Sequence, residues 1–266
     1  MNDEVVIVRG GGDIASGTIQ KLFNSGFKIL ILEVEKPTAI RRSVCYSEAI
    51  YDGYAVVEDV KSVLVKDLDE IEKAWSDGYI PVIIDTDGKY IDIIKPAAVV
   101  DAILAKKNLG TCKSMAPITI ALGPGFEAGK DVDIVIETMR GHNLGRLIFQ
   151  GSALKNTGVP GVIGGVSKER VIYSPCEGKI NNVRQIGDIV EAGEIIAYVE
   201  EMEVKTIIAG ILRGIIRNEA YVTKGLKIAD VDPRLSEKNN CFTISDKARS
   251  IGGGVLEAIL FLKNRK

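Results

Sequence analysis

The glycine-rich segment GGGDIASG at residues 10–17 constrains the fold of this chain more than any other feature of its sequence. It follows an apolar, β-branched run at residues 5–8, which predicts a strand buried on both faces. Ala15, Ile19 and Leu22 then recur at helical spacing, and a second apolar run ends at Glu33. The order of strand, glycine turn, helix and strand is typical of a Rossmann-like unit.

The turn matches the pattern Gly-x-Gly-x-x-Ala of dinucleotide-binding sites. In that pattern the first glycine permits a tight turn, the second lets backbone approach a phosphate, and the small third residue allows close packing of helix on strand. An acid after the second strand accepts hydrogen bonds from ribose hydroxyls. We therefore predict a cofactor-binding site that includes Gly10, Gly11, Gly12, Asp13, Ala15 and Glu33.

Two features of this turn keep another interpretation open. Asp13 places a negative charge where a pyrophosphate would lie, and its carboxylate could cap the helix instead. The same residues would also form a tight turn in a domain that has lost its ligand. Arg41 and Arg42, after the second strand, are candidate phosphate contacts because a guanidinium matches phosphate oxygens, although they could equally be a solvated pair.

Further along the chain, strand and helix patterns alternate. Apolar runs predict strands at residues 54–57, 63–65 and 80–85, and periodic patterns predict helices at residues 67–76 and 96–107. Strands that alternate with helices indicate a parallel, doubly wound sheet. The predicted fold class is therefore α/β, with a Rossmann-like parallel sheet.

Polar, glycine-dense loops follow the next three apolar runs, at residues 123–129, 138–146 and 150–158. Such loops are where binding residues gather. Their cationic and hydrogen-bonding side chains suit an anionic ligand with many polar groups, and we add four of them to the predicted site: Arg140, His142, Asn143 and Ser152. His142 is the single histidine, so a two-histidine metal site is excluded, and we predict no bound metal.

The segment from about residue 169 to 234 is duplicated. A shift of 32 residues aligns Gly178 with Gly210, and the frame Val-x-x-Gly-x-x-Ile-Ala-x-Val occurs twice, at residues 190–199 and 222–231. This duplication predicts a small β barrel-sandwich-hybrid module, like biotinyl and lipoyl carrier domains. Lys205 is displaced from the carrier position, which favours a structural or docking module.

Three domains are expected from these patterns. Residues 1–168 form the α/β domain with its glycine-rich loops, residues 169–234 the duplicated module, and residues 235–266 a C-terminal helix that packs back on the α/β domain. The glycine triplet at residues 252–254 either brings a helix N-terminus toward an anion or permits a close helix crossing. The sequence does not choose between these two roles.

Composition excludes several classes of partner. The net charge of -2 gives no basic surface for nucleic acid or for an anionic membrane. No signal-peptide pattern or apolar run of membrane-spanning length occurs, so we expect a cytoplasmic protein. The four cysteines lie far apart and predict reduced thiols, of which Cys45 and Cys241 are candidates for a reactive thiol.

Several long stretches of the chain together carry a family resemblance. GGGDIASG, IRRSVCYSEAIYDG, TMRGHNLGRLIFQGSALKNTGVPG, ADVDPR and ISDKARSIGGGVLEA resemble the YqeB family of selenium-dependent molybdenum hydroxylase systems, through nearly the whole chain. The resemblance implies an accessory protein for maturation of such a hydroxylase. It further implies molybdopterin dinucleotide as a ligand and the hydroxylase apoenzyme as a partner.

Three functions are therefore expected candidates. The first is a maturation factor that binds a nucleotide-containing anionic ligand. The second is an NAD-dependent oxidoreductase, which the glycine turn favours and the lack of a recognisable acid–base pair disfavours. The third is a non-catalytic docking scaffold for the hydroxylase. The expected cofactor is molybdopterin dinucleotide or NAD(P), and neither enzymatic activity nor a homodimer is decided by the sequence.

Overall fold

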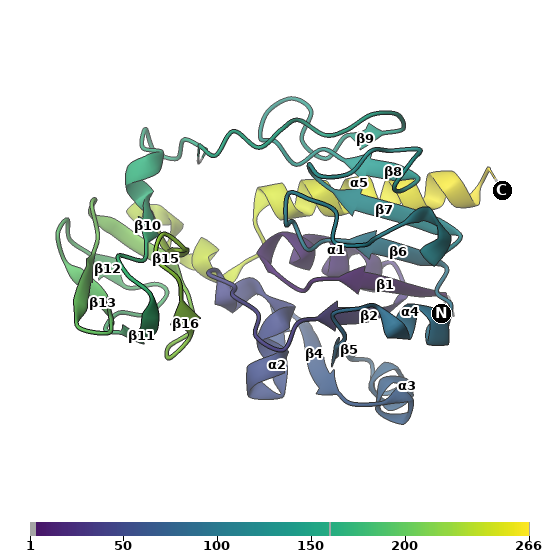
Figure 1. The fold of residues 1–266 in the computed structure, drawn as a ribbon, viewed down its shortest axis with the longest axis horizontal. Coiled ribbons are helices and arrows are strands. Elements are labelled where there is room, and N and C mark those ends of the chain that lie inside the picture. Colours follow the sequence, from purple (N-terminus) through teal and green to yellow (C-terminus); the bar gives the residue numbers. More distant parts are fainter. Residues whose placement is uncertain (1–3, 160, 266) are drawn as a thin grey trace. The chain divides into compact units, whose positions relative to one another are not determined.

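The computed structural model describes residues 4–159 and 161–265, which fall into two compact units (Figure 1). The first unit comprises the chain up to Pro37, Cys45–Asn156, and the chain from Ile244 on. The second unit comprises Thr38–Val44 and Thr157–Thr243. No helix in the described part of the chain is long and apolar enough to cross a membrane.

A nine-stranded sheet forms the middle of the first unit. Its strands are β1 (Val5–Arg9), β2 (Lys28–Glu33), β3 (Tyr54–Val57), β4 (Val60–Val65), β5 (Ile80–Ile84), β6 (Ala98–Asp101), β7 (Ile118–Leu122), β8 (Ile134–Ile136) and β9 (Leu147–Ile148). They lie in the order β3-β4-β5-β2-β1-β6-β7-β8-β9. All neighbours from β4 to β8 pair in parallel, whereas β3 and β9 pair antiparallel at the two edges.

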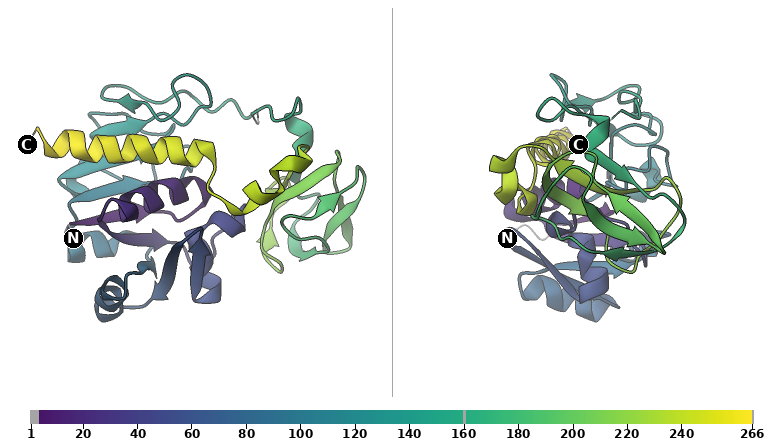
Figure 2. Two further views of the ribbon diagram at one scale, coloured as in Figure 1. Left: turned by 180° about the vertical axis from the view of Figure 1, so that it is seen from behind. Right: turned by 90° about the vertical axis from the view of Figure 1, so that its left-hand side faces the viewer.

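Helices cover both faces of this sheet. On one face α1 (Asp13–Asn24) and α5 (Asp246–Lys263) lie side by side (Figure 2). On the other face Ile71 of α3 (Leu68–Ser76) and Ile91 of α4 (Lys89–Ile94) join Ile7 of the sheet in one apolar core. Burial of both faces explains why the central strands are apolar without alternation.

Short helical turns complete the elements of the chain. They are α2 (Ala49–Asp52) and the 3-10 helices η1 (Arg42–Val44), η2 (Tyr46–Glu48), η3 (Lys113–Met115), η4 (Lys168–Arg170) and η5 (Leu235–Phe242). The helix predicted at residues 67–76 is confirmed by α3. Asp67 caps the N-terminus of this helix, because its side chain accepts a hydrogen bond from the Glu70 amide. The helix predicted at residues 96–107 is wrong, because the β-branched run there forms β6 between β1 and β7.

Glycines bring α1 and α5 into backbone contact. A Cβ on Gly17 would overlap the carbonyl of Ala248, and a Cβ on Gly252 would overlap the carbonyl of Gly17. A Cβ on Gly254 would likewise overlap the carbonyl of Gly145. The glycine triplet therefore lies inside α5 and permits a close crossing, and it does not form the N-terminus of that helix.

The second unit contains two four-stranded antiparallel sheets. One has the order β10-β17-β15-β12 and the other the order β14-β13-β11-β16. The strands are β10 (Val171–Tyr173), β11 (Gly178–Asn182), β12 (Ile189–Val190), β13 (Ile195–Val199), β14 (Met202–Lys205), β15 (Gly210–Ile215), β16 (Tyr221–Val222) and β17 (Lys227–Asp232). The sequence repeat recurs in the pairing, because Ile180 opposite Val199 corresponds to Leu212 opposite Val231. All four side chains are buried in one core.

The predicted fold class, a Rossmann-like parallel sheet with a barrel-sandwich-hybrid module, is wrong. The large sheet is mixed, because β3 joins β4 through a tight hairpin that needs no crossover helix and β9 returns antiparallel on β8. In the second unit the segment expected to be the hairpin between the repeats forms strand β14, which pairs with β13. Lys205 ends that strand and forms an ion pair with Glu203, so it is not at the tip of a carrier hairpin.

Candidate functional site

The glycine turn lies at the carboxyl end of β1, where the order of strands changes direction. The chain continues from β1 to β2 on one side, whereas β6 lies on the other. In open α/β sheets this is the place where ligands bind. Gly10 has φ of +92°, and a Cβ there would lie 3.1 Å from the carbonyl oxygen of Ala102, after β6. Both observations restrict this position to glycine.

Glu33, predicted to accept hydrogen bonds from a ribose, joins the end of β2 to this turn. Its Oε2 accepts a hydrogen bond of 2.8 Å from the Gly11 amide, and its Oε1 accepts one of 2.9 Å from the Val34 amide. Burial raises the pKa of the Glu33 carboxyl, while the two hydrogen bonds act in the opposite direction. The carboxylate is only half-buried, so it can still accept hydrogen bonds from a ligand.

Gly12 is the N-terminal cap of α1 and leaves that end of the helix open. Its backbone is extended, with φ of -73° and ψ of -177°, and a Cβ there would meet nothing within 4 Å. As a glycine, Gly12 supplies no side-chain cap to the helix, and Asp13 is the acidic residue of its first turn. Asp13 is the first residue of the helix and not its cap, whereas Ala15 is fully buried against the sheet. Partial positive charge at such an open end attracts anions.

The N-terminus of α5 brings cationic side chains to the same end of the helix pair. Lys247 is half-buried there, and its pKa is lowered first by burial and then by the charge of Arg140, while Asp13 opposes the shift. Arg140 donates two hydrogen bonds to Asp246, of 2.9 and 3.2 Å. The sequence predicted Arg140 but missed Lys247, because no local pattern shows that α5 lies beside α1.

A buried ion pair supports the floor of this site. Arg9 ends β1 and Asp101 ends β6, and they are 4% and 2% exposed. The hydroxyl of Thr111 lies between them, since it accepts from Arg9 Nη1 at 2.5 Å and donates to Asp101 Oδ2 at 2.6 Å. Asp101 also accepts from the Ile103 amide, which holds the loop after β6 against Gly10. The sequence did not predict this ion pair, because residues 96–107 were predicted to form a helix and not the strand that Asp101 ends. The β-branched Val99 and Val100 were a signal for that strand.

Other predicted site residues lie outside this group of contacts. His142 and Asn143 are exposed in the loop after β8, where Asn143 accepts a hydrogen bond from Arg146, and Ser152 is exposed after β9. Arg41 and Arg42 belong to the second unit. Arg41 donates to the carbonyls of Asn240 and Thr243, and Arg42 donates to that of Ile215. These arginines therefore brace the second unit, which provides no support for their predicted role as phosphate contacts.

The cysteines are free thiols of unequal accessibility. Cys45 and Cys241, the candidates for a reactive thiol, are both buried, and burial raises the pKa of Cys241. A reactive cysteine requires the opposite shift. Cys112 is exposed instead, 3.1 Å from the hydroxyl of Ser114. Among the described residues, no group of three or more histidine, cysteine or acidic side chains could hold a metal ion.

Sequence comparison relates the chain to one curated protein with high identity. Over 262 residues it is 48% identical to YqeB of Escherichia coli strain K12, a protein whose function is uncharacterized. The alignment covers 98% of this chain. This likeness supports the YqeB family. The chain spans about half the length of that relative, 48% of it, and no protein-family model matches the chain.

Solved structures resemble the chain only weakly. An aspartoacylase family protein from Mesorhizobium loti is 10% identical, with a TM-score of 0.28 over 88% of this chain and 86% of that one. The ectoine utilization protein EutE from Ruegeria pomeroyi is also 10% identical, with a TM-score of 0.27 over 86% and 85%. A succinylglutamate desuccinylase from Silicibacter has a TM-score of 0.26, at 10% identity over 86% and 84%. No activity is carried over from likenesses this low.

Proposed function

We propose that this chain is an accessory protein for the maturation of a selenium-dependent molybdenum hydroxylase, and that it binds a nucleotide-containing anionic ligand such as molybdopterin dinucleotide. The ligand binds at the carboxyl edge of the nine-stranded sheet, against the glycine turn. Gly11, Gly12, Glu33, Arg140 and Lys247 are the residues that recognise it.

The observation that carries the proposal is the open N-terminus of α1 beside the half-buried Lys247. Gly12 has no side chain, and a Cβ there would meet nothing within 4 Å among the described residues, so a phosphate can approach the amide groups of this helix end. Asp13 adds a negative charge in the first turn, which Lys247 partly offsets. Lys247 lies at the N-terminus of the neighbouring helix α5, where burial disfavours its charged form. A bound anion would offset that cost, which makes an anionic ligand the natural complement of this site.

Glu33 supports a ligand that carries more than phosphate. It lies beside the turn, bonded to Gly11, and has oxygens that accept hydrogen bonds. A carboxylate repels phosphate but accepts from sugar hydroxyls, so one ligand with a phosphate at α1 and hydroxyls at Glu33 satisfies both groups. A nucleotide has this chemistry. Molybdopterin dinucleotide has it too, and its second anionic part would compete with Asp246 for Arg140.

The maturation role comes from the family resemblance of the stretches quoted above. The identity of 48% to the Escherichia coli protein supports the YqeB family, and that protein is itself uncharacterized. Because the chain corresponds to about half of that relative, the partner apoenzyme and the activity of the whole relative are part of the proposal. Homologous residues cover the proposed site, since the alignment spans nearly the whole chain.

Titration of the purified chain tests ligand identity. Molybdopterin cytosine dinucleotide, CTP and NAD(H) are added in turn, and the thermal stability of the protein is followed. A ligand present at a hundred times its dissociation constant adds about 2.7 kcal/mol to the free energy of unfolding. We expect this response for the pterin nucleotide. Stabilisation by NAD(H) alone would favour the oxidoreductase, and no response to any of the three would favour the docking scaffold.

Two variants at Gly12 separate binding from folding. The position is extended and open, so Gly12→Asp and Gly12→Asn can both be accommodated and can both cap α1. Each should therefore preserve or slightly raise the stability of the free protein. Only Gly12→Asp adds a negative charge, so it should weaken ligand binding far more than Gly12→Asn does. Equal affinities of the two variants for the ligand would contradict the proposal that an anionic group binds at this helix end.

A further inference from the structure

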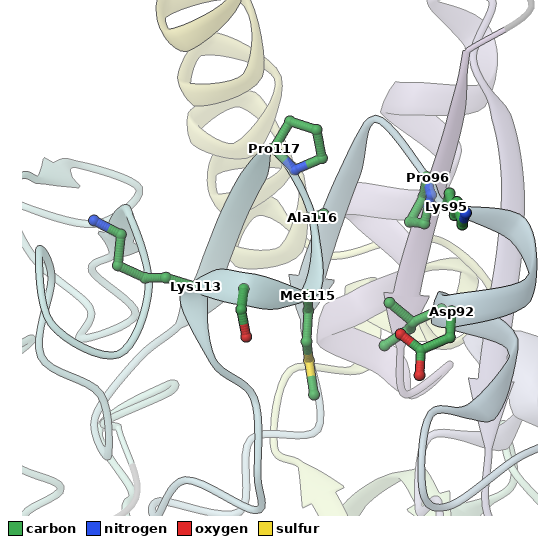
Figure 3. Close-up of a pocket in the computed structure, with 9 residues that line it drawn as sticks. Asp92, Lys95, Pro96, Lys113, Met115, Ala116 and Pro117 are labelled. Carbon is green, nitrogen blue, oxygen red and sulfur yellow. The ribbon is translucent and has the colours of Figure 1, made fainter.

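A pocket of about 490 Å³ lies at the amino edge of the large sheet, opposite the glycine turn. It is formed where Pro96 leads into β6 and Pro117 leads into β7, with the end of α4 on one side (Figure 3). The volume falls within the range of small-molecule sites in proteins. None of the residues of the glycine turn lines it, so this pocket requires an explanation of its own.

Two opposite charges, both on solvent-exposed residues, line this pocket without pairing with each other. Asp92 and Lys95 both line it, three residues apart at the end of α4. On a regular helix this spacing favours an ion pair. Lys95 instead has φ of +51°, in the left-handed region, which takes it out of the helical path. Among the described residues, neither side chain takes part in an ion pair or hydrogen bond.

The third charged group of the lining is already neutralised. Lys113 Nζ lies 3.2 Å from Asp133 Oδ1 and 3.5 Å from the carbonyl oxygen of Gly129. Figure 3 shows its side chain directed away from Asp92 and Lys95. The pocket therefore presents one available anion and one available cation.

The rest of the lining is apolar except for Ser114, whose hydroxyl lies 3.1 Å from the Cys112 thiol. Ile91 is buried beneath it, Met115 is half-buried, and Pro96 and Pro117 have no backbone N–H to donate. A methionine side chain adapts its shape to different apolar groups. Such a surface accepts an aliphatic side chain and offers it few hydrogen bonds.

We propose that this pocket binds a small zwitterion with an apolar side chain, of the α-amino acid class. The ammonium group pairs with Asp92, the carboxylate pairs with Lys95, and the aliphatic part contacts Met115. A ligand with both charges satisfies the two unpaired side chains at once, whereas a ligand with one charge leaves the other unpaired. The site is independent of the ligand at the glycine turn.

The test uses the full chain with L-leucine as the probe, observed through the methyl resonance of Met115 by NMR. Isocaproate lacks the ammonium group and leucinamide lacks the carboxylate, so both should bind roughly tenfold more weakly than leucine. Asp92→Asn and Lys95→Gly should weaken leucine binding by a similar factor. Lys95→Gly also suits the left-handed backbone, so it should not destabilise the fold.

Matched controls lie just outside the pocket. Lys89→Ala, on the same helix, and Asp87→Asn, just before it, remove the same charges but do not touch the lining. Both should leave the affinity for leucine unchanged. Equal binding of all three probes would reduce the site to an apolar surface and overturn the proposal. An unmoved Met115 resonance, or equal losses in the control variants, would overturn it as well.

Discussion

The close crossing of α1 and α5 makes opposite predictions for two adjacent glycines. Gly252 and Gly253 both lie inside α5. A Cβ at Gly252 would lie much less than 3.0 Å from the carbonyl of Gly17, and real Cβ atoms essentially never come closer than 3.0 Å to another heavy atom. A Cβ at Gly253 would meet nothing within 4 Å. Alanine should therefore destabilise the protein at the first position and stabilise it at the second.

The difference between these two variants isolates the crossing. Alanine in place of glycine stabilises a helix interior by about 1 kcal/mol, and this gain is common to both positions. Overpacking costs about 1–3 kcal/mol, and the upper end applies here because the atoms in conflict are backbone atoms that cannot rotate away. Gly252→Ala should thus be less stable than Gly253→Ala by about 3 kcal/mol, and less stable than the parent by about 2 kcal/mol.

Tryptophan fluorescence during unfolding in urea measures this difference. The single tryptophan, Trp75, donates a hydrogen bond to the Ile29 carbonyl in the first unit, so its signal reports the unit that contains the crossing. The midpoint should fall for Gly252→Ala and rise for Gly253→Ala. Equal midpoints would mean that the helices can separate at no cost, which would refute the argument from backbone contact.

Three further predictions follow from the buried and exposed polar groups. Asp101→Ala leaves the charge of Arg9 buried and unpaired, so we expect a loss of about 3–5 kcal/mol in the free energy of unfolding. The double variant Arg9→Met with Asp101→Leu should recover much of this loss. An equal loss in the single and the double variant would contradict the pairing. The pKa of Lys247 is lowered in the folded state, so its protonated form destabilises the fold. At a pH below that lowered pKa, Lys247→Met should therefore raise the midpoint of urea unfolding. This gain should vanish as the pH rises toward 10.5, the ordinary pKa of lysine. A thiol reagent should modify Cys112 rapidly and Cys241 slowly. Cys176 is half-buried, so fast labelling that persists in the double variant Cys112→Ser with Cys176→Ser would show that a buried thiol is accessible.

Much of the local structure could be predicted because its signals are local. The strand before the glycine turn, the helix after it and the capped helix α3 each follow from periodicity or from one capping residue. The sequence placed Glu33 after the second strand, at the same sheet edge as the turn, but its hydrogen bond with Gly11 comes from the structure. Lys247 could not, because it lies more than two hundred residues away and reaches Asp13 only through the crossing of α1 and α5.

The failures have a common physical cause. A short apolar run such as that of residues 98–101 has no periodicity that separates a strand from a buried helix, so its pairing with β1 and β7 decides the outcome. The direction of an edge strand is likewise decided by the turn that precedes it and not by its own residues, which is why the sheet is mixed. Arg41 and Arg42 lie in a short segment between two parts of the first unit, but they belong to the second unit and donate to its carbonyls.

By itself, the sequence determined that Gly10 permits a tight turn, and it left two roles open for the glycine triplet at residues 252–254. Only the tertiary structure decided what each glycine is needed for, because the sequence does not show which atom occupies the space left by the missing Cβ. The carbonyl of Gly17 fills the space at Gly252, and that of Ala102 faces Gly10. At Gly12 no atom of the described residues lies within 4 Å of a Cβ, and this is the space that the proposed ligand would take.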